Sequence, residues 1–417
     1  MSAWIRHCVW WHVYPLGFAG VRIRPEADGG GGTENHGASA GLDSLGPWLD
    51  YLIGLGANGL ALGPVFRSQT HGYDTVDYYA IDPRLGDDAA FDRLISGCHD
   101  RGIAVMLDGV FNHVGTGHPL FRAAMEGDEA AGSMFHLSGE GVARDYRDFE
   151  GHRGLAALNH DSPRVAELVA DVMRHWLRRG ASAWRLDAAY AVAPEFWNRV
   201  LPQVRREFPE AWFVGEVIHG DYADLVQRSG IDSVTQYELW KAIWSSLADG
   251  NFYELDWCLK RHNELLETMV PMTFVGNHDV TRIASRIGEE ATRLAVAVLL
   301  TVGGIPSVYY GDERGLRGVK RDELGGDDEV RPAFPAGPEY LDPSGEPMMR
   351  LHQELLALRR RQPWLTAART ETRHLDNRAY EYEAVGADGQ GLVVDLRLDP
   401  HPSATISPPD EPVIRIG

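Results

Sequence analysis

The sequence predicts an α/β protein built on a (β/α)8 TIM barrel, and two observations lead to this fold class. Short apolar runs alternate with longer amphipathic segments along most of the chain, which is typical of βα units in a parallel sheet. Eight such units can be counted, and eight close naturally into a barrel. In that fold the active site lies at the C-terminal ends of the strands, on the loops that follow them.

The expected strands are the short apolar runs, and the helical patterns lie between and after them. The strands are expected at residues 8–14, 58–63, 103–108, 182–187, 211–216, 231–236, 270–275 and 305–309. The helices are expected near residues 42–55, 88–101, 163–179, 194–208, 221–229, 238–267, 289–302 and 346–361. One helix start is clearly marked, because Ser162 offers an N-cap hydroxyl and Pro163 suits the first turn. Two arginines and a glycine at residues 178–180 mark its end.

An open, doubly wound sheet is the alternative architecture for alternating βα units. It would usually carry a glycine-rich phosphate loop after the first strand, and the sequence has none there. The bare glycine run at residues 29–32 is better explained as a flexible loop tip.

Two segments interrupt the alternation and predict smaller units attached to the barrel. Residues 112–160, after the third strand, are too long for a βα loop and indicate a short inserted subdomain. Residues 366–417 contain period-two stretches such as 392–398 and indicate a small C-terminal β-domain. The barrel itself is therefore expected to comprise residues 1–111 and 161–365.

Composition and charge exclude several functional classes. The formal net charge of -20 disfavours binding to nucleic acid or to an anionic membrane, since both would repel the protein. Cys8, Cys98 and Cys258 are few and scattered, so they support neither a disulfide framework nor a thiolate metal site. A neutral substrate is compatible with this charge.

The N-terminal residues 1–15 lack the apolar segment and the small-residue cleavage site of a signal peptide. No run approaches the roughly 18 to 20 apolar residues that a membrane span needs. We therefore expect a soluble, cytoplasmic protein.

Three acidic residues end apolar runs in distant parts of the sequence. They are Asp187, Glu216 and Asp279. Any one of them could equally be a helix N-cap or a structural ion-pair partner. Because the C-terminal ends of barrel strands meet at one face, three such acids together indicate one shared site.

Four short segments occur in order at the ends of the third, fourth, fifth and seventh expected strands. They are Asp108-Gly-Val-Phe-Asn-His113, Trp184-Arg-Leu-Asp187, Val214-Gly-Glu-Val217 and Phe274-Val-Gly-Asn-His-Asp279. Together they resemble the signature regions of the α-amylase family of retaining glycoside hydrolases. Further segments at 71–86, 155–159 and 304–313 are similar to those of the cyclomaltodextrinase and neopullulanase members.

The resemblance implies a pair of catalytic carboxyls, as retaining glycoside hydrolysis requires. Asp187 would be the nucleophile that forms a covalent glycosyl-enzyme. Arg185, on the same face of its strand, would keep that carboxylate ionised. Glu216 would be the general acid and then the base that activates water, and its apolar approach favours the protonated form that a general acid needs.

The resemblance also implies how the sugar is held. Asp279 would bind sugar hydroxyls more tightly in the transition state, and His113 and His278 would donate hydrogen bonds to the same sugar. Tyr73 would stack beneath it. No metal is expected at the site and no cofactor is required, while Asn112, a usual calcium ligand in amylases, leaves a structural calcium ion open.

The sequence departs from the family pattern on the acceptor side of the site. Tyr190 and Ala191 replace the Lys-His or Asn-Glu pairs found after the nucleophile in relatives, and Ile218 with His219 replaces the aromatic residue that commonly follows the acid. Acceptor-side specificity therefore cannot be copied from either group.

A second feature of the sequence is a loose match after the eighth strand. Asp327 and Arg331 resemble a pair that bounds the non-reducing end of the site in some relatives, although a solvated loop ion pair explains them as well.

The expected function is retaining hydrolysis of α-glucosidic bonds, α-1,4 in the first instance, in maltooligosaccharides or cyclodextrins. The main alternative is a transglycosylase, glucanotransferase or sugar isomerase, because these share the nucleophile and the acid. A non-catalytic carbohydrate-binding barrel is disfavoured, since both carboxyls are present. An oligosaccharide is thus the expected partner, and the sequence leaves the oligomeric state open.

Overall fold

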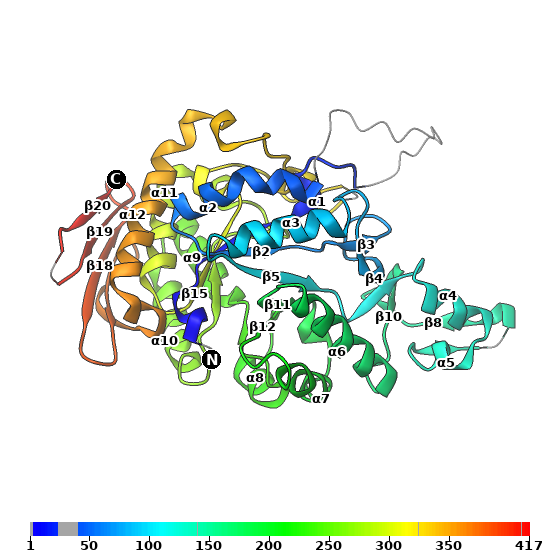
Figure 1. The fold of residues 1–417 in the computed structure, drawn as a ribbon. Helices are drawn as coiled ribbons and strands as arrows, with labels where there is room; N and C mark the ends of the chain where they lie inside the picture. The colour runs from blue at the N-terminus through cyan, green and yellow to red at the C-terminus, as the bar shows by residue number, and fades with distance from the viewer. Residues whose placement is uncertain (1–2, 24–40, 140, 324, 410) are drawn as a thin grey trace.

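The computed structural model describes residues 3–23, 41–139, 141–323, 325–409 and 411–417 (Figure 1). The glycine run at 29–32 lies outside these residues. The expected (β/α)8 barrel is confirmed, and each of the eight expected strands is present within three residues of its expected ends. They are β1 (Trp10–Val13), β2 (Gly59–Leu62), β5 (Ala104–Gly109), β11 (Ala183–Leu186), β12 (Trp212–Gly215), β13 (Ser233–Val234), β14 (Met272–Phe274) and β15 (Ile305–Tyr309).

The eight strands form one parallel sheet that curves round until its ends meet. Their order is β13, β12, β11, β5, β2, β1, β15 and β14. A single parallel bridge between Thr235 and Met272 joins the two ends, and the Gln236 amide donates to the Met272 carbonyl at 2.9 Å. The alternative of an open sheet is therefore wrong.

The register of the central strands determines which residues meet at the C-terminal face. Arg185 of β11 is aligned with Asp108 of β5 on one side and with Val214 of β12 on the other. Leu186 is aligned with Gly215, so the next residues, Asp187 and Glu216, leave their strands side by side. Nearly all residues of these strands are buried, as expected of a sheet covered by helices on the outside and packed within.

Helices surround the barrel (Figure 1). They are α1 (Pro15–Phe18), α2 (Leu49–Leu55), α3 (Asp88–His99), α6 (Pro163–Arg178), α7 (Pro194–Arg205), α8 (Tyr222–Ser229), α9 (Tyr237–Asp249), α10 (Phe252–Leu265), α11 (Ile283–Thr301) and α12 (Glu346–Arg361). The segment expected as one helix at 238–267 is two helices. Gly250, with φ 62°, ends α9 in the left-handed conformation, and the Asn251 side chain accepts from the Tyr253 amide to start α10.

The helix α6 begins and ends where the sequence predicts, but its N-cap differs. Pro163 occupies the first turn, and Gly180 follows the helix with φ 102°. The Ser162 hydroxyl makes no capping hydrogen bond to the described part of the helix; instead the Ser162 carbonyl accepts from the Val165 and Ala166 amides. The expected hydroxyl cap is therefore wrong, although the position is right.

The segment after β5 extends away from the barrel beyond the C-terminal ends of its strands (Figure 1). It contains β6 (His113–Gly115), α4 (Pro119–Glu126), α5 (Glu129–Gly132), β7 (Leu137–Ser138), β8 (Asp145–Tyr146), β9 (Asp148–Phe149) and β10 (His152–Ala157). β6, β10 and β9 form an antiparallel sheet. A hairpin of β3 (Phe66–Ser68) and β4 (Thr75–Ile81), which the sequence pattern did not indicate, lies after β2.

The expected C-terminal β-structure is confirmed as a five-stranded antiparallel sheet. Its strands, in spatial order, are β16 (Arg369–Leu375), β17 (Ala379–Val385), β18 (Gly391–Arg397), β19 (Ser403–Ser407) and β20 (Ile414–Ile416). The sheet packs against α10 and α11. Within the described residues, no helix has both the length and the apolar character to cross a membrane.

Candidate active site

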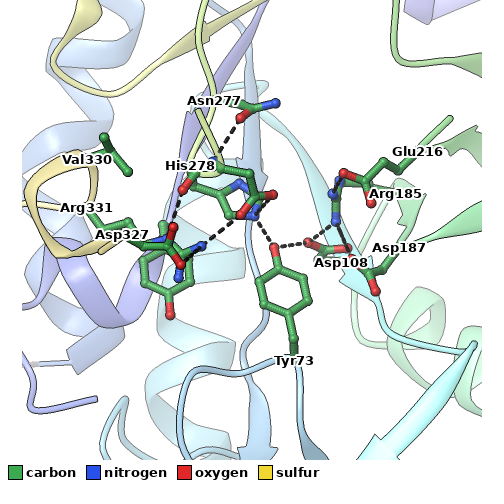
Figure 2. Close-up of polar contacts among 12 residues, drawn as sticks. Tyr73, Asp108, Arg185, Asp187, Glu216, Asn277, His278, Asp327, Val330 and Arg331 are labelled. Carbon is green, nitrogen blue, oxygen red and sulfur yellow. Dashed lines mark hydrogen bonds and ion pairs between the residues drawn. The ribbon is translucent and has the colours of Figure 1, made fainter. Parts of the chain in front are cut away.

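The strand ends bring the predicted acidic residues to one face of the barrel. Asp187 and Glu216 are the first residues after β11 and β12, while Asp279 lies in the loop after β14. Figure 2 shows Asp187 and Glu216 on one side of Tyr73 and His278, and Arg331 with Asp327 on the other. The site therefore has two charged groups that Tyr73 and His278 join.

Arg185 is the centre of the first group. Its Nη1 lies 2.6 Å from Asp108 Oδ2 and 3.3 Å from Asp187 Oδ1, and its Nη2 lies 2.7 Å from Glu216 Oε1. All four side chains are buried. Arg185 thus contacts Asp187 as expected, but its shorter contacts are to Asp108 and Glu216. Asp108 begins the first family segment, and its position at a strand end was the signal that could have marked it as a site residue.

The two carboxyls beside Arg185 influence each other. Burial and the neighbouring Glu216 carboxyl raise the pKa of Asp187 well above its ordinary value, against the attraction of Arg185. The attraction of Arg185 therefore does not outweigh burial and the Glu216 carboxyl, contrary to the expectation that Arg185 keeps Asp187 ionised.

Glu216 has further polar partners on the barrel loops. Its Oε2 accepts from the Ala188 amide at 3.0 Å, and its Oε1 accepts from the Tyr237 hydroxyl at 3.3 Å. Ala188 has φ 46°, a left-handed conformation that alanine rarely adopts and that helps to aim its amide at Glu216. The Asn277 side-chain amide in turn donates to Tyr237 Oη at 2.9 Å. Tyr237 follows the short β13, and no sequence motif marked it.

Tyr73 and His278 connect the two halves of the site. The Tyr73 hydroxyl lies 3.1 Å from Asp108 Oδ2 and also contacts His278 Nε2. The two rings are nearly parallel, with centroids 5.5 Å apart. His278 Nε2 lies 3.0 Å from Asp279 Oδ2, so the contacts run from Asp108 to Asp279 without a break.

Arg331 anchors the second group. Its Nη2 lies 2.8 Å from Asp279 Oδ1, and its Nε donates to the His278 carbonyl at 2.9 Å. Burial alone would raise the pKa of Asp279, but His278 and Arg331 hold it well below its ordinary value. Arg331 is buried and lies 3.3 Å from Asp327, so a merely solvated loop ion pair does not describe it.

His113 is placed by the start of the insertion. Its Nε2 lies 2.9 Å from the Tyr73 carbonyl oxygen, and its ring stacks on Phe149 with centroids 4.8 Å apart. Burial lowers the pKa of His113 to about 4, so the ring is neutral near pH 7. The neighbouring Asn112 side chain contacts His113 Nδ1. Among the described residues, no group of three or more His, Cys, Asp or Glu side chains is arranged to hold a metal ion.

A cleft of about 460 Å³ lies over these residues. Five of the seven predicted site residues line it, and these are Tyr73, His113, Asp187, Glu216 and Asp279. The other two, Arg185 and His278, line a small cavity of about 20 Å³ at the same end of the barrel. A larger depression of about 540 Å³ lies at the N-terminal ends of the strands, where a barrel of this type carries no active site.

Comparison with known proteins agrees with this geometry. The family model described as alpha amylase, catalytic domain, matches residues 32–382. The chain belongs to the alpha-amylase family. This confirms the resemblance that the four strand-end segments indicated.

Relatives within the alpha-amylase family are similar over most of this chain. A cyclomaltodextrinase from Geobacillus thermopakistaniensis is 30% identical over 402 residues, which cover 89% of this chain and 66% of that protein. Neopullulanase 2 from Thermoactinomyces vulgaris is 32% identical over 352 residues, covering 81% and 58%. The chain spans between 56% and 66% of the length of the first curated relatives it matches.

Two solved structures match this chain nearly end to end. The cyclic alpha-maltosyl-(1→6)-maltose hydrolase from Arthrobacter globiformis, in complex with its cyclic sugar, has a TM-score of 0.83 at 27% identity and covers 100% of this chain and 97% of that one. A debranching enzyme from Nostoc punctiforme has a TM-score of 0.78 at 26% identity, covering 97% and 92%.

Proposed function

We propose that this protein is a retaining α-glucan hydrolase that cleaves α-glucosidic bonds through a covalent glycosyl-enzyme. One observation carries the proposal: Asp187, Glu216 and Asp279 leave three barrel strands at the same face and line one cleft with Tyr73 and His113. Membership of the alpha-amylase family supports the same chemistry.

In the proposed reaction, Asp187 attacks the anomeric carbon while Glu216 gives its proton to the departing glycosidic oxygen. The bond from the anomeric carbon to that oxygen breaks as the ester to Asp187 forms. Water then attacks the anomeric carbon, Glu216 takes its proton, and Asp187 leaves as a carboxylate. The cycle needs a proton on Glu216 and a negative charge on Asp187, and Arg185 contacts both carboxyls.

The remaining site residues would hold the sugar on the donor side of the bond. Asp279, kept ionised by its cationic neighbours, would accept hydrogen bonds from hydroxyls of the reacting sugar. His278 would donate to the same sugar, and the Tyr73 ring would pack against it. His113 would donate to that sugar only by giving up the hydrogen bond from its Nε2 to the Tyr73 carbonyl. Hydrogen bonds to hydroxyls that strengthen in the transition state are part of glycoside hydrolysis in general.

Maltooligosaccharides and cyclodextrins, with α-1,4 bonds, are the proposed substrates. The relatives named cyclomaltodextrinase, maltogenic alpha-amylase and neopullulanase support this class. A structural neighbour named as a hydrolase of a cyclic sugar with an α-1,6 bond adds that compound to the candidates. The test is the initial rate on maltotriose, a cyclodextrin, the cyclic maltosyl-maltose, pullulan, isomaltose, sucrose and trehalose, with NMR identification of the first anomer formed. Inversion of configuration, or no turnover of any α-1,4 glucan, would refute the proposal.

A glucanotransferase is the second candidate, because one relative carries that name. The 4-alpha-glucanotransferase from Thermotoga neapolitana is 31% identical over 304 residues. In that reaction a sugar hydroxyl replaces water as the attacking group. Products longer than maltotriose, formed as the main product from maltotriose, would favour transfer over hydrolysis.

The proposal includes the organisation expected from the sequence. The catalytic barrel comprises residues 1–111 and 161–365, the inserted subdomain residues 112–160, and the β-domain residues 366–417. The enzyme needs no cofactor for the reaction and works in the cytoplasm. Titration with a chelator tests whether the reaction needs a metal ion. A lower folding stability with an unchanged kcat would indicate a structural calcium ion.

A further inference from the structure

The turn between β9 and β10 holds a glutamate in a conformation that few side chains adopt. Glu150 has φ 51° and Gly151 has φ 83°, so both central residues of this two-residue turn lie in the left-handed region. Turns of this kind favour Asn-Gly, because asparagine tolerates the conformation. A long side chain held there is strained, and residues kept under strain cluster at functional sites.

The Glu150 side chain joins the insertion to the barrel. Its Oε1 accepts a hydrogen bond from the Tyr190 hydroxyl at 3.0 Å. Burial, together with the carboxylate of Glu150, raises the pKa of Tyr190, so the hydroxyl remains a donor at neutral pH. The neighbouring Phe149 stacks on His113, which fixes the hairpin from its other side.

Tyr190 lies beside the proposed general acid. It belongs to the short 3-10 helix Ala189–Ala191 that follows the nucleophile, and its amide donates to the Glu216 carbonyl at 3.3 Å. Its ring lies 5.2 Å from that of His219. Ile218, which is 40% exposed, lines the cleft together with Tyr190 and Glu150.

The acid gives its proton to the leaving group, so the surface next to it faces the leaving sugar rather than the donor sugar. Arg331, which contacts Asp279, lies across Tyr73 and His278 from Glu216 (Figure 2). A tyrosine ring and an isoleucine side chain offer an apolar surface to the C–H face of a sugar, and a carboxylate accepts from its hydroxyls.

We infer that Tyr190, held in place by Glu150, is the specificity-determining residue for the glucosyl unit of the leaving group. The inference rests on the proposed hydrolysis and names the acceptor half of the same cleft. The strained turn places the Glu150 carboxylate where it fixes the Tyr190 ring, and Ile218 completes the surface. Tyr190 occupies a position at which the sequence departs from its family. Glu150 lies in the inserted segment.

Two substrates that share a donor but differ in leaving group separate the acceptor contribution. Maltotriose leaves a glucose, whereas α-maltosyl fluoride leaves only fluoride and keeps the acceptor half empty. The readout is the ratio of kcat/KM for maltotriose to kcat/KM for the fluoride. Glu150→Asn and Tyr190→Phe each remove the hydrogen bond, and each should lower this ratio about 5-fold, the equivalent of one hydrogen bond. Tyr190→Ala, which also removes the ring, should lower it further.

The matched controls test whether the residues act in binding or only in folding. Glu150→Gln keeps the acceptor oxygen and should retain most of the ratio. Tyr79→Phe removes a similar tyrosine-to-carboxylate hydrogen bond, to Asp171 at 2.8 Å, outside the cleft, and should leave the ratio unchanged. Asparagine suits the left-handed turn, so Glu150→Asn should unfold at the same or a higher temperature than the wild type.

Each outcome decides the inference. An unchanged ratio in Glu150→Asn and Tyr190→Phe overturns it while the proposed hydrolysis stands. A lower Tm for Glu150→Asn with an unchanged ratio assigns Glu150 to folding and overturns it too. If the wild-type protein turns over neither substrate, the proposed function is refuted instead. Turnover of the fluoride does not depend on the acceptor surface, so it tests the proposed function separately.

Discussion

Replacing Arg331 by methionine should weaken catalysis and shift its pH dependence, because Asp279 loses the arginine that contacts it directly. Arg331 Nη2 lies 2.8 Å from Asp279 Oδ1, and Arg331 Nε holds the loop through the His278 carbonyl at 2.9 Å. Methionine keeps a long apolar stem in the same space but brings no charge. The change therefore tests the electrostatic contribution more than the packing.

The magnitude follows from the burial of the pair. Removing one partner of a buried ion pair costs about 3–5 kcal/mol. Because the Asp279 side chain is 31% exposed, we take about 2–3 kcal/mol as the loss at this site. If most of it appears in the transition state, kcat/KM falls by about 30- to 150-fold.

The direction of the pH effect follows from the pKa of Asp279. Burial acts to raise this pKa, and His278 and Arg331 together hold it well below its ordinary value. Without Arg331 the pKa rises, so the acid limb of kcat/KM should move to higher pH. A carboxyl with a depressed folded pKa contributes stability above its unfolded pKa and loses it as pH falls through the folded pKa. The stability difference between wild type and Arg331→Met should thus be large at neutral pH and shrink in acid.

The assay is the pH profile of initial rates on maltotriose, with urea unfolding measured over the same pH range. Arg314→Met is the matched control, since Arg314 is buried and pairs with Glu346 at 2.7 Å outside the cleft. It should lower stability without moving the acid limb. A wild-type acid limb in Arg331→Met, with the variant folded, would refute the role assigned to Arg331.

Three further outcomes are expected. Asp187→Asn should lower kcat by several orders of magnitude while sugar binding, measured by calorimetry, persists; turnover near the wild-type rate would remove Asp187 as nucleophile. Tyr237→Phe should lower kcat about 5-fold, because the hydrogen bond to Glu216 is lost. An unchanged kcat would show that this hydrogen bond does not contribute to catalysis. Gly276→Ala should lower both Tm and kcat, because a Cβ there would lie 2.1 Å from Asp312 Oδ2, whereas Gly154→Ala, which meets nothing within 4 Å, should change neither.

The sequence predicted the barrel well because each strand is a short apolar run with a polar or turn-forming residue at its end. The strand β15, for example, coincides with the expected range 305–309. The long amphipathic segment at 238–267 was harder, because apolar periodicity runs through both α9 and α10. Only Gly250 and Asn251, which end one helix and start the next, carry the division.

The candidate site was predictable where a residue is fixed by its own strand, and not where it depends on a loop. Asp187 and Glu216 follow from strand ends alone. Tyr237 reaches Glu216 from the first position of α9, just after the short β13, and Glu150 reaches Tyr190 from the tip of a hairpin 40 residues earlier in the chain. Neither of these two contacts can be predicted from the periodicity or the composition of the sequence.

The single bridge that closes the barrel makes one seam weaker than the others. Between β13 and β14 only the pair Thr235 and Met272 is bridged, and the Ser233 hydroxyl adds a bond to the Val270 carbonyl. Segments with few ladder bonds open at lower free energy than the rest of a sheet. The Gln236 amide, which donates across this seam to the Met272 carbonyl, should therefore exchange with deuterium sooner than the amides of β11. Tyr237 and Asn277, which hydrogen-bond to each other just above this seam, would then be the parts of the site most affected by its breathing.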